Sequence, residues 1–286
     1  MRFLRYIENG REGLAVVVGD EARGLCVDDA TYPGELTTLV GLGTRGLTRA
    51  ADQLRQGTAI DLKTVDYLPP LGPTTRIICM GINYLEHVKE AGYEVPKYPT
   101  FFTRYQSSIV GHGTKLIRPK VSVQFDYEGE LVIVIGKRGR YIPADKALEH
   151  VAGYSICNDG SIRDFQFATT QWTLGKNFDG TGSIGPYFVT AEDLPAGGSG
   201  LSLQTRLNGQ VVQNSRTDNL IFNAAAIVAY LSEGITLEPG DVIPTGTPPG
   251  VGWGRKPQLF MKAGDRCEVE IEGVGTLSNT IADENR

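Results

Sequence analysis

Short apolar runs, separated by residues that form turns, recur along most of this chain. Each run is rich in Val, Ile or aromatic residues and is bounded by Gly, Pro, Asn or Asp, a pattern typical of β-strands. The stretch LNGQ places an Asn-Gly pair between two such runs, which predicts a β-hairpin. Between residue 71 and the C-terminus, the predicted strands lie at 76–81, 130–136, 151–159, 185–191, 201–212, 241–246 and 266–281.

Helical patterns are fewer. Residues 221–234, IFNAAAIVAYLSEG, form the one convincing amphipathic helix, which ends at Gly234. Residues 37–57 predict a weaker helix, and YLEHVKEAG at 84–92 predicts a short helix or an ordered loop that stops at Gly92.

Strands and helices do not alternate, so a doubly wound parallel sheet is not expected. Residues 1–70 predict a small N-terminal domain with a hairpin at 15–29, followed by a Pro-rich link at 67–76. For residues 71–286 the pattern predicts a mainly antiparallel β-roll or sandwich with α insertions. The predicted fold class is therefore α+β, and mainly β.

Composition and charge exclude several classes of protein. The 286 residues are 41% hydrophobic and carry a net charge of −5 without a basic stripe, so nucleic acid is not an expected partner. No run of 18 apolar residues predicts a membrane span, and the N-terminus lacks the apolar region of a signal peptide. Four separated cysteines without a CxxC predict reduced thiols, and hence a cytoplasmic protein without a disulfide framework or a zinc site.

The stretch FDYEGELVIVIG raises a question about charge. It predicts a strand at 125–136, yet Asp126, Glu128 and Glu130 are spaced by two and are expected on one face of that strand. Two solvent-facing acids on an edge strand are one interpretation, but LVIVI offers no polar face for them to share. Buried like charges need a cation, and ligands that are all oxygen favour Mg²⁺, Mn²⁺ or Ca²⁺ over zinc.

Asp159 is a candidate third ligand, because it ends the apolar run VAGYSIC. The same Asn-Asp-Gly stretch is also an ordinary turn signal. Arg163 and Gln166 follow within two helical turns. Arg163 is most simply explained by an ion pair with a nearby acid, and Gln166 by a surface amide.

His87 and Glu90 are three residues apart and would be neighbours on a helix. A carboxylate beside an imidazole orients it and raises its basicity, which suits a general base. A capping or surface pair is the commoner explanation of an isolated HxxE. Lys176, in WTLGKNFDG, could stabilise developing negative charge or could be a surface lysine. The stretch DVIPTGTPPGVG, which contains Thr247, is a weak signal for close approach of a ligand.

Taken together, these segments resemble the fumarylacetoacetate hydrolase family over residues 71–286. No single segment is decisive, but their order is specific. The segments are GINYLEHVKEAG, DYEGELVIVIGK, GYSICNDGSIRDFQ, WTLGKNFD, GPYFVT, LNGQVVQNSRTDNLIF, LEPGDVIPTGTPPGVG and GDRCEVEIEGVGTLSN.

The resemblance implies the β-rich catalytic domain of that family, a homodimer, and a site for Mg²⁺ or Mn²⁺. It implies that this site is formed by Glu128, Glu130 and Asp159, and it assigns Asp126 no ligand role. The roles it implies for other residues are a dyad on a mobile lid for His87 and Glu90, an active-site lysine for Lys176, and places near the substrate for Arg163, Gln166 and Thr247.

One departure concerns the stretch FFTRYQSS, where family members often carry a lysine followed by proline. At this position the chain has Arg104. Its planar guanidinium can bind a carboxylate through two hydrogen bonds, and we expect it to contact the substrate.

The activity expected from this resemblance is hydrolysis of a C–C bond in a 2,4-diketo acid, an acylpyruvate of fumarylpyruvate type. The metal would bind the pyruvoyl end, His87 would activate water, and Lys176 would stabilise the enolate. Decarboxylation of oxaloacetate or a related 2-keto acid is an alternative, as is isomerisation on the same scaffold. An inactive, metal-stabilised binding protein is the non-enzymatic alternative.

Overall fold

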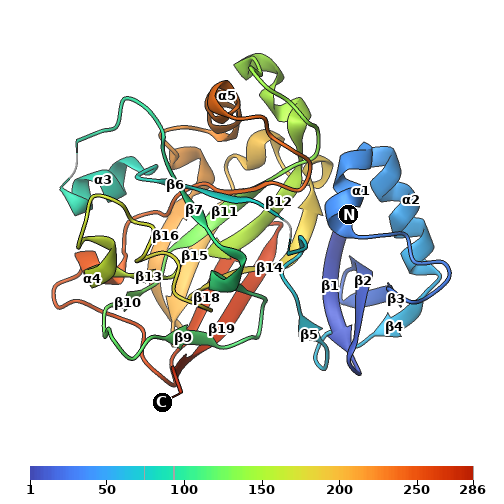
Figure 1. The fold of residues 1–286 in the computed structure, drawn as a ribbon, viewed down its shortest axis with the longest axis horizontal. Coiled ribbons are helices and arrows are strands. Elements are labelled where there is room, and N and C mark those ends of the chain that lie inside the picture. The colour runs from blue at the N-terminus through green and yellow to red at the C-terminus, as the bar shows by residue number, and fades with distance from the viewer. Residues whose placement is uncertain (74, 93, 286) are drawn as a thin grey trace.

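A mostly antiparallel sheet of twelve strands runs through the molecule (Figure 1). The structure is a computed structural model that describes residues 1–73, 75–92 and 94–285. The sheet has the order β4-β3-β2-β1-β14-β12-β11-β17-β6-β7, with β5 beside β1 and β8 beside β14. Its strands are β1 Arg2–Glu8, β2 Arg11–Val18, β3 Glu21–Cys26, β4 Thr58–Ile60, β5 Asp66–Tyr67, β6 Ile77–Gly81, β7 Thr100–Arg104, β8 Ile109–Val110, β11 Gly129–Ile135, β12 Val151–Asn158, β14 Gly182–Thr190 and β17 Val242–Pro244.

A second sheet of five strands, in the order β16-β15-β18-β19-β9, packs against the first. Leu131 and Ile133 of β11 share one apolar cluster with Leu203 and Val269 of the second sheet, so the main core lies between the two layers. A separate pair, β10 and β13, lies beside them. The bounds are β9 Leu116–Arg118, β10 Phe125–Asp126, β13 Ser161–Ile162, β15 Ser202–Leu207, β16 Gln210–Arg216, β18 Arg266–Ile271 and β19 Gly275–Asp283.

The predicted hairpin is confirmed. Asn208 and Gly209 join β15 to β16 with φ angles of 52° and 80°, the left-handed backbone that an Asn-Gly turn requires. The predicted fold class is also confirmed, since antiparallel pairs dominate both sheets and the helices are insertions.

The helices are α1 Leu36–Leu39, α2 Gly43–Arg55, α3 Leu85–Ala91, α4 Arg163–Gln166 and α5 Ala224–Gly234. Short 3₁₀ segments lie at η1 Val40–Leu42, η2 Gln106–Ser108, η3 Ala144–His150, η4 Ala191–Asp193, η5 Ala196–Gly198, η6 Thr217–Asn219 and η7 Gly252–Gly254. Both predicted helices are present. The helix with the weaker sequence pattern, α2, is the longer of the two, with 13 residues against 11 in α5.

Two local features explain where these helices begin, end and pack. Leu47 and Leu54 are among the residues that α2 buries on its inner face. The side chain of Asn223 caps α5 by accepting a hydrogen bond from the backbone N–H of Ala226. Gly92 ends α3 in the left-handed conformation, as predicted.

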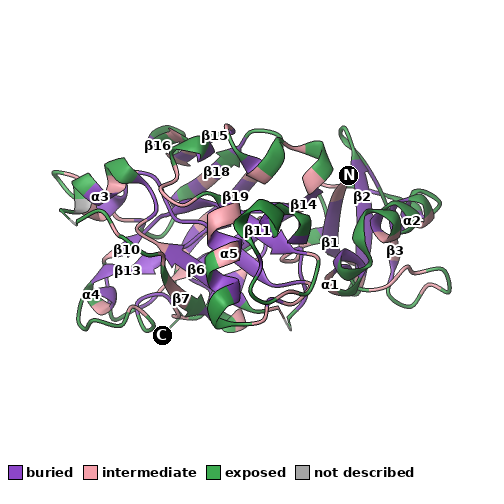
Figure 2. Ribbon diagram, turned by 90° about the horizontal axis from the view of Figure 1, so that it is seen from above, coloured by how far each residue is buried: buried purple, intermediate pink, exposed green. Residues whose placement is uncertain are grey.

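The N-terminal strands join the main sheet directly. β1, which the sequence pattern did not predict, pairs with β14 so that Phe3 faces Phe188. Phe3 and Leu14 belong to the same apolar cluster as Val132 of β11, and in Figure 2 the ribbon of β1 and β11 is largely purple, the colour of buried residues. The domain boundary at residue 70 stays a prediction, because sheet and core continue across it.

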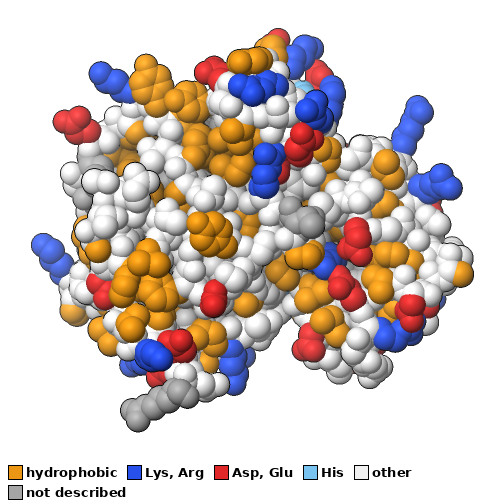
Figure 3. Space-filling model, viewed as in Figure 1, with side chains coloured by type: hydrophobic (Ala, Val, Ile, Leu, Met, Phe, Trp, Pro, Cys, Tyr) orange, Lys and Arg blue, Asp and Glu red, His pale blue; other side chains and the backbone are white. Residues whose placement is uncertain are grey.

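Figure 3 shows one face of the molecule, on which charged side chains of both signs are exposed. Lys and Arg side chains there are scattered among Asp and Glu side chains. Within the described residues, no helix is long and apolar enough to cross a membrane.

Candidate functional site

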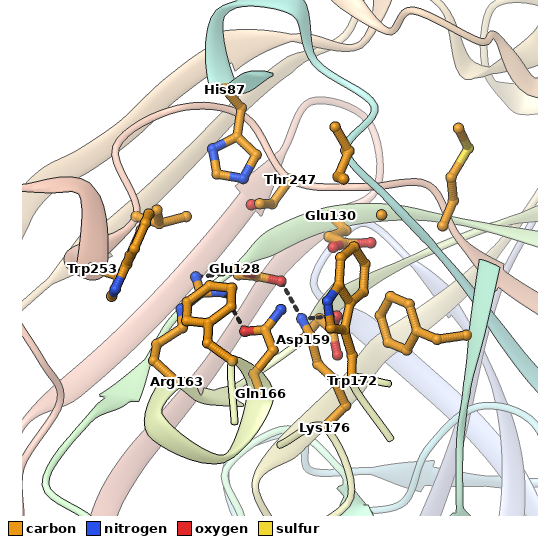
Figure 4. Close-up of a pocket in the computed structure, with 16 residues that line it drawn as sticks. His87, Glu128, Glu130, Asp159, Arg163, Gln166, Trp172, Lys176, Thr247 and Trp253 are labelled. Carbon is orange, nitrogen blue, oxygen red and sulfur yellow. Dashed lines mark hydrogen bonds and ion pairs between the residues drawn. The ribbon is translucent and has the colours of Figure 1, made fainter. Parts of the chain in front are cut away.

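A small cavity opens between helix α3 and the carboxyl end of β12 (Figure 4). Its volume is about 40 Å³. The lining residues are Met80, Gly81, Ile82, His87, Phe102, Glu128, Glu130, Asp159, Arg163, Gln166, Phe167, Trp172, Lys176, Thr247, Val251 and Trp253.

The predicted metal ligands form one buried cluster on the cavity floor. Each of Glu128, Glu130 and Asp159 offers a carboxylate oxygen, and these oxygens lie within 4.8 Å of one another. Pairing of β11 with β12 brings them together, because Glu130 lies opposite Cys157, two residues before Asp159. The backbone N–H of Asp159 also donates to the carbonyl oxygen of Glu128 at 2.8 Å.

Three cationic side chains neutralise part of this acid cluster. Lys176 Nζ lies 2.6 Å from Glu128 Oε2 and 2.7 Å from Asp159 Oδ2. Arg163 Nη2 lies 2.6 Å from Glu128 Oε1. Arg104 Nη1 donates to Asp159 Oδ1 at 2.5 Å.

The pKa shifts follow from burial and from these partners. Burial acts to raise the pKa of the Glu128 carboxyl, but Arg163 and Lys176 outweigh it and lower that pKa to about 2. Burial acts to lower the pKa of Lys176, yet Asp159 and Glu128 raise that pKa above its ordinary value. Lys176 is therefore a permanent cation at neutral pH and cannot serve as the base.

Glu130 differs from its neighbours. It accepts a hydrogen bond from the backbone N–H of Gly246 at 2.8 Å, and no described Lys, Arg or His forms an ion pair with it. Burial, followed by the nearby Asp159 and Glu128 carboxylates, raises the pKa of Glu130 well above its ordinary value. Glu130 is thus the carboxylate that lacks a positive partner.

The donor set fits a hard divalent cation. Together with Asp126, which also contacts Arg163, the site holds four buried carboxyl groups against three cations, and Glu130 is the carboxyl without a cationic partner among the described residues. The three clustered carboxyl oxygens suit Mg²⁺ or Mn²⁺, which prefer oxygen ligands. The acid cluster could hold such an ion.

His87 and Glu90 lie together above the acid cluster, on α3. The His87 Nδ1 atom is 3.0 Å from Glu90 Oε2, and His87 lines the cavity on the side opposite Lys176 (Figure 4). Glu90 also accepts from the backbone N–H of Gly250, at 3.0 and 3.2 Å. The structure brings the pair to the cavity, while its catalytic role stays a prediction. Tyr93, within the predicted lid segment, lies outside the described residues.

Gln166 and Thr247 line the cavity, as the predicted contact with substrate requires. Gln166 Oε1 accepts from Arg163 Nη1 at 2.8 Å, so Gln166 is not the surface amide considered above. Thr247 Oγ1 donates to the carbonyl oxygen of Gly129 and accepts from Gln213. Arg163 forms the ion pairs expected of it, with Asp126 and Glu128.

Arg104 is placed differently from the expectation that it contacts the substrate. It is 3% exposed, does not line the cavity, and lies behind Asp159, where it also bonds Ser108 and Thr181. Strand β7 directs the side chain into the core, where it contacts a predicted metal ligand, and the predicted contact with the substrate stays a prediction.

The expectation that Asp126 shares a face with the two glutamates is wrong. Strand β10 ends at Asp126 and β11 begins only at Gly129, so the alternation of side chains is interrupted between them. Asp126 bonds to Arg163 and to the backbone N–H of Gly252 and is not part of the acid cluster.

Aromatic side chains that sequence reasoning missed form the cavity walls. Phe102 and Trp172 meet edge to face with ring centroids 5.6 Å apart, and Phe167 and Trp253 lie 4.9 Å apart. Trp172 precedes Lys176 by four residues in the segment already considered, but the other three carry no local signal.

Comparisons with known proteins agree with this architecture. The family described as "Fumarylacetoacetate (FAA) hydrolase C-terminal" matches residues 76–282. Oxaloacetate tautomerase fahd2, mitochondrial, from Xenopus laevis is 39% identical over 274 residues, which cover 95% of this chain and 86% of the relative. Oxaloacetate tautomerase FAHD2A, mitochondrial, from Homo sapiens is 39% identical over 272 residues, which cover 94% of this chain and 86% of the relative.

Solved structures show the same fold with several names. A fumarylacetoacetate hydrolase from psychrophilic Exiguobacterium antarcticum has a TM-score of 0.86 at 35% identity and covers 99% of this chain and 100% of its own. A maleylpyruvate hydrolase from Sphingobium sp. SYK-6 has a TM-score of 0.81 at 27% identity, with coverage of 99% and 100%. This chain belongs to the fumarylacetoacetate hydrolase family.

Proposed function

We propose that this protein is a metal-dependent enzyme that interconverts the keto and enol forms of a short 2-keto acid of the oxaloacetate type. The observation that carries the proposal is the compact cavity in which three carboxylates face His87. Relatives named oxaloacetate tautomerase, at 39% identity over nearly the whole chain, support isomerisation over the hydrolysis expected from sequence.

Charge supports an anionic substrate. A divalent cation held by Glu128, Glu130 and Asp159 would supply positive charge to the carboxylate and 2-keto oxygens of the substrate. A bound divalent cation would give Glu130 a positive partner. The positive charge that the cation adds would attract the carboxylates of a 2-keto diacid.

The protein's own residues then divide the work of moving one proton between C3 and the C2 oxygen. His87, oriented by Glu90, would take the proton from C3 and deliver the same proton to the C2 oxygen, and the reverse reaction would return it to C3. Lys176 remains charged and keeps Glu128 and Asp159 in place beside the developing enolate. Gln166 Oε1 accepts a hydrogen bond from Arg163, so the amide NH₂ of Gln166 can donate to a substrate oxygen.

Hydrolysis of an acylpyruvate remains the second candidate. The His87–Glu90 pair could activate water as well as remove a proton from carbon, and the fold is shared with a maleylpyruvate hydrolase. The homodimer and the cytoplasmic location stay predictions, and the frog and human relatives are named mitochondrial.

The test is to follow the enol absorbance of oxaloacetate with Mn²⁺ or Mg²⁺, while lactate dehydrogenase and NADH report any pyruvate. Isomerisation accelerates the change in absorbance without producing pyruvate. Pyruvate formed from oxaloacetate would show decarboxylation, and pyruvate formed only from acylpyruvates would show hydrolysis. Either result would replace the proposal.

A further inference from the structure

Asp126 is the one acid of the stretch DYEGE that the acid cluster leaves out, yet it is completely buried. Its Oδ1 accepts from the backbone N–H of Tyr127 at 2.9 Å and of Gly252 at 2.7 Å. Its Oδ2 accepts from the backbone N–H of Trp253 at 2.9 Å and from Arg163 Nε at 2.8 Å. Both oxygens are therefore fully used.

All four partners of Asp126 are N–H donors. A carboxylate can accept from all of them, whereas an amide must turn its NH₂ group toward at least one pair of donors. Leaving such buried groups unsatisfied is costly, so the position requires an acid. This requirement explains Asp126 without a metal-ligand role.

The partners of Asp126 lead in two directions. Toward the acid cluster, Arg163 binds Asp126 through Nε and Glu128 through Nη2. Asp126 thus holds the guanidinium that positions a predicted metal ligand, and it takes up part of the positive charge that would otherwise compete with a metal for Glu128.

Toward the lid, Asp126 holds the loop on which α3 docks. We call residues 250–253 the rim. Asp126 binds the rim at Gly252 and Trp253, and the neighbouring Tyr127 hydroxyl donates to the carbonyl oxygen of Gly250 at 3.0 Å. On the other side of the rim, the Gly250 N–H donates to Glu90, which contacts His87.

We propose that Asp126 is a positioning residue that couples the metal site to the docking of the lid helix. Occupation of the acid cluster by a metal fixes Glu128, and Arg163 and Asp126 transmit that order to the rim. The rim then holds Glu90 and, through it, His87. The proposal rests on the metal site of the proposed function, but not on the identity of the substrate.

The first experiment uses the unaltered protein and Mn²⁺ alone. Hydrogen exchange is measured at the amides of 85–92 and 250–253, without metal and with saturating Mn²⁺. We expect the metal to slow exchange in both segments, although neither contains a metal ligand. Equal exchange with and without Mn²⁺ would overturn the proposal.

The second experiment compares Asp126→Asn with Asp241→Asn. Asp241 is a matched control, because it is 3% exposed, pairs with Arg76 and accepts from the backbone N–H of Glu238, but does not line the cavity. Loss of a residue that supports a metal ligand typically weakens metal binding about 10- to 100-fold, and we expect this loss of Mn²⁺ affinity for Asp126→Asn. We also expect saturating Mn²⁺ no longer to slow exchange at 85–92 in this variant.

Asp241→Asn should keep both the Mn²⁺ affinity and the metal-induced protection, even if it lowers stability. Retention of both properties by Asp126→Asn, or their equal loss in both variants, would contradict the proposal. If Asp126→Asn does not fold, the first experiment decides alone. No arm uses a keto acid, so failure of the proposed activity leaves these results interpretable.

Discussion

The core between the two sheets and the acid cluster are equally hidden from solvent, but they are built from opposite kinds of side chain. One strand, β11, serves both: Leu131 and Ile133 enter the core, while Glu130 at its start reaches the cavity floor. Burial of a large apolar side chain stabilises the fold by about 1.5–3 kcal/mol. Burial of carboxylates costs free energy unless cations compensate them. The apolar side chains of β11 thus anchor the strand that carries Glu130 to the site.

The comparison also shows that the cationic partners in the site are unevenly distributed among its carboxylates. Glu128 and Asp159 have cationic partners, whereas Glu130 has only a backbone N–H among the described residues. A buried group without a partner in the apolar core would force the core to repack or would lower stability. We interpret the missing positive partner of Glu130 as the place that a metal cation would take.

The largest effect should come from removal of the Glu130 carboxylate. Glu130→Ala leaves too few hard oxygen ligands for a strongly hydrated ion, and we expect it to abolish both Mn²⁺ binding and metal-dependent turnover. Calorimetric titration with Mn²⁺ and the enol assay check this. Glu149→Ala, at an exposed glutamate, is the control. Full Mn²⁺ affinity in Glu130→Ala would remove the metal site from this position.

The next effect concerns the base. General-base assistance is typically worth about 10² to 10⁴ in rate, and we expect His87→Ala to lose turnover by a factor in that range. Mn²⁺ affinity should change little, because His87 lies on the opposite side of the cavity from Lys176 and is not in the acid cluster. Glu90→Gln should lower the rate in the same direction and by less. An unchanged kcat in His87→Ala, at saturating metal, would exclude this histidine as the base.

A substitution in the core should lower stability and leave metal binding unchanged. Leu203 is completely buried between the sheets, and replacement of such a leucine by alanine costs about 2–5 kcal/mol of unfolding free energy. We expect Leu203→Ala to lower stability in urea by that amount while Mn²⁺ affinity is retained. Val211→Ala, at a half-exposed position of β16, should cost less than about 0.5 kcal/mol. A large loss of metal affinity in Leu203→Ala would show that core and site are not separable.

The same contrast separates what the sequence could predict from what it could not. The hairpin at Asn208 and Gly209 and the acids Glu128, Glu130 and Asp159 depend on local patterns and on strand alternation, which sequence displays. The place of Arg104 depends on the direction in which β7 enters the core, which no local pattern encodes.

Asp126 was misplaced for a related reason. Alternation predicts faces only while a strand continues, and the break after Asp126 falls within an unbroken apolar and acidic pattern. The aromatic walls were missed because Phe102 and Trp253 come from segments 151 residues apart in the chain, which only the fold brings together.

The smallest effect tests a partly buried titratable group that lies outside the acid cluster. The His112 ring packs against Tyr67 at an interplanar angle of 56°, and its Nδ1 accepts from the backbone N–H of Ser278 at 3.1 Å, so the fold requires that nitrogen to be unprotonated. Burial lowers the pKa of His112 in the folded protein, and the unfolded chain therefore binds a proton more readily. Stability should be fully present above the unfolded pKa of about 6.5 and should fall as pH drops below it, with a slope of at most about 1.4 kcal/mol per pH unit. His112→Asn keeps an acceptor for Ser278 but does not titrate. Urea unfolding between pH 5 and 8 should therefore give a flatter pH profile for the variant, and identical profiles would show that His112 contributes nothing to this dependence.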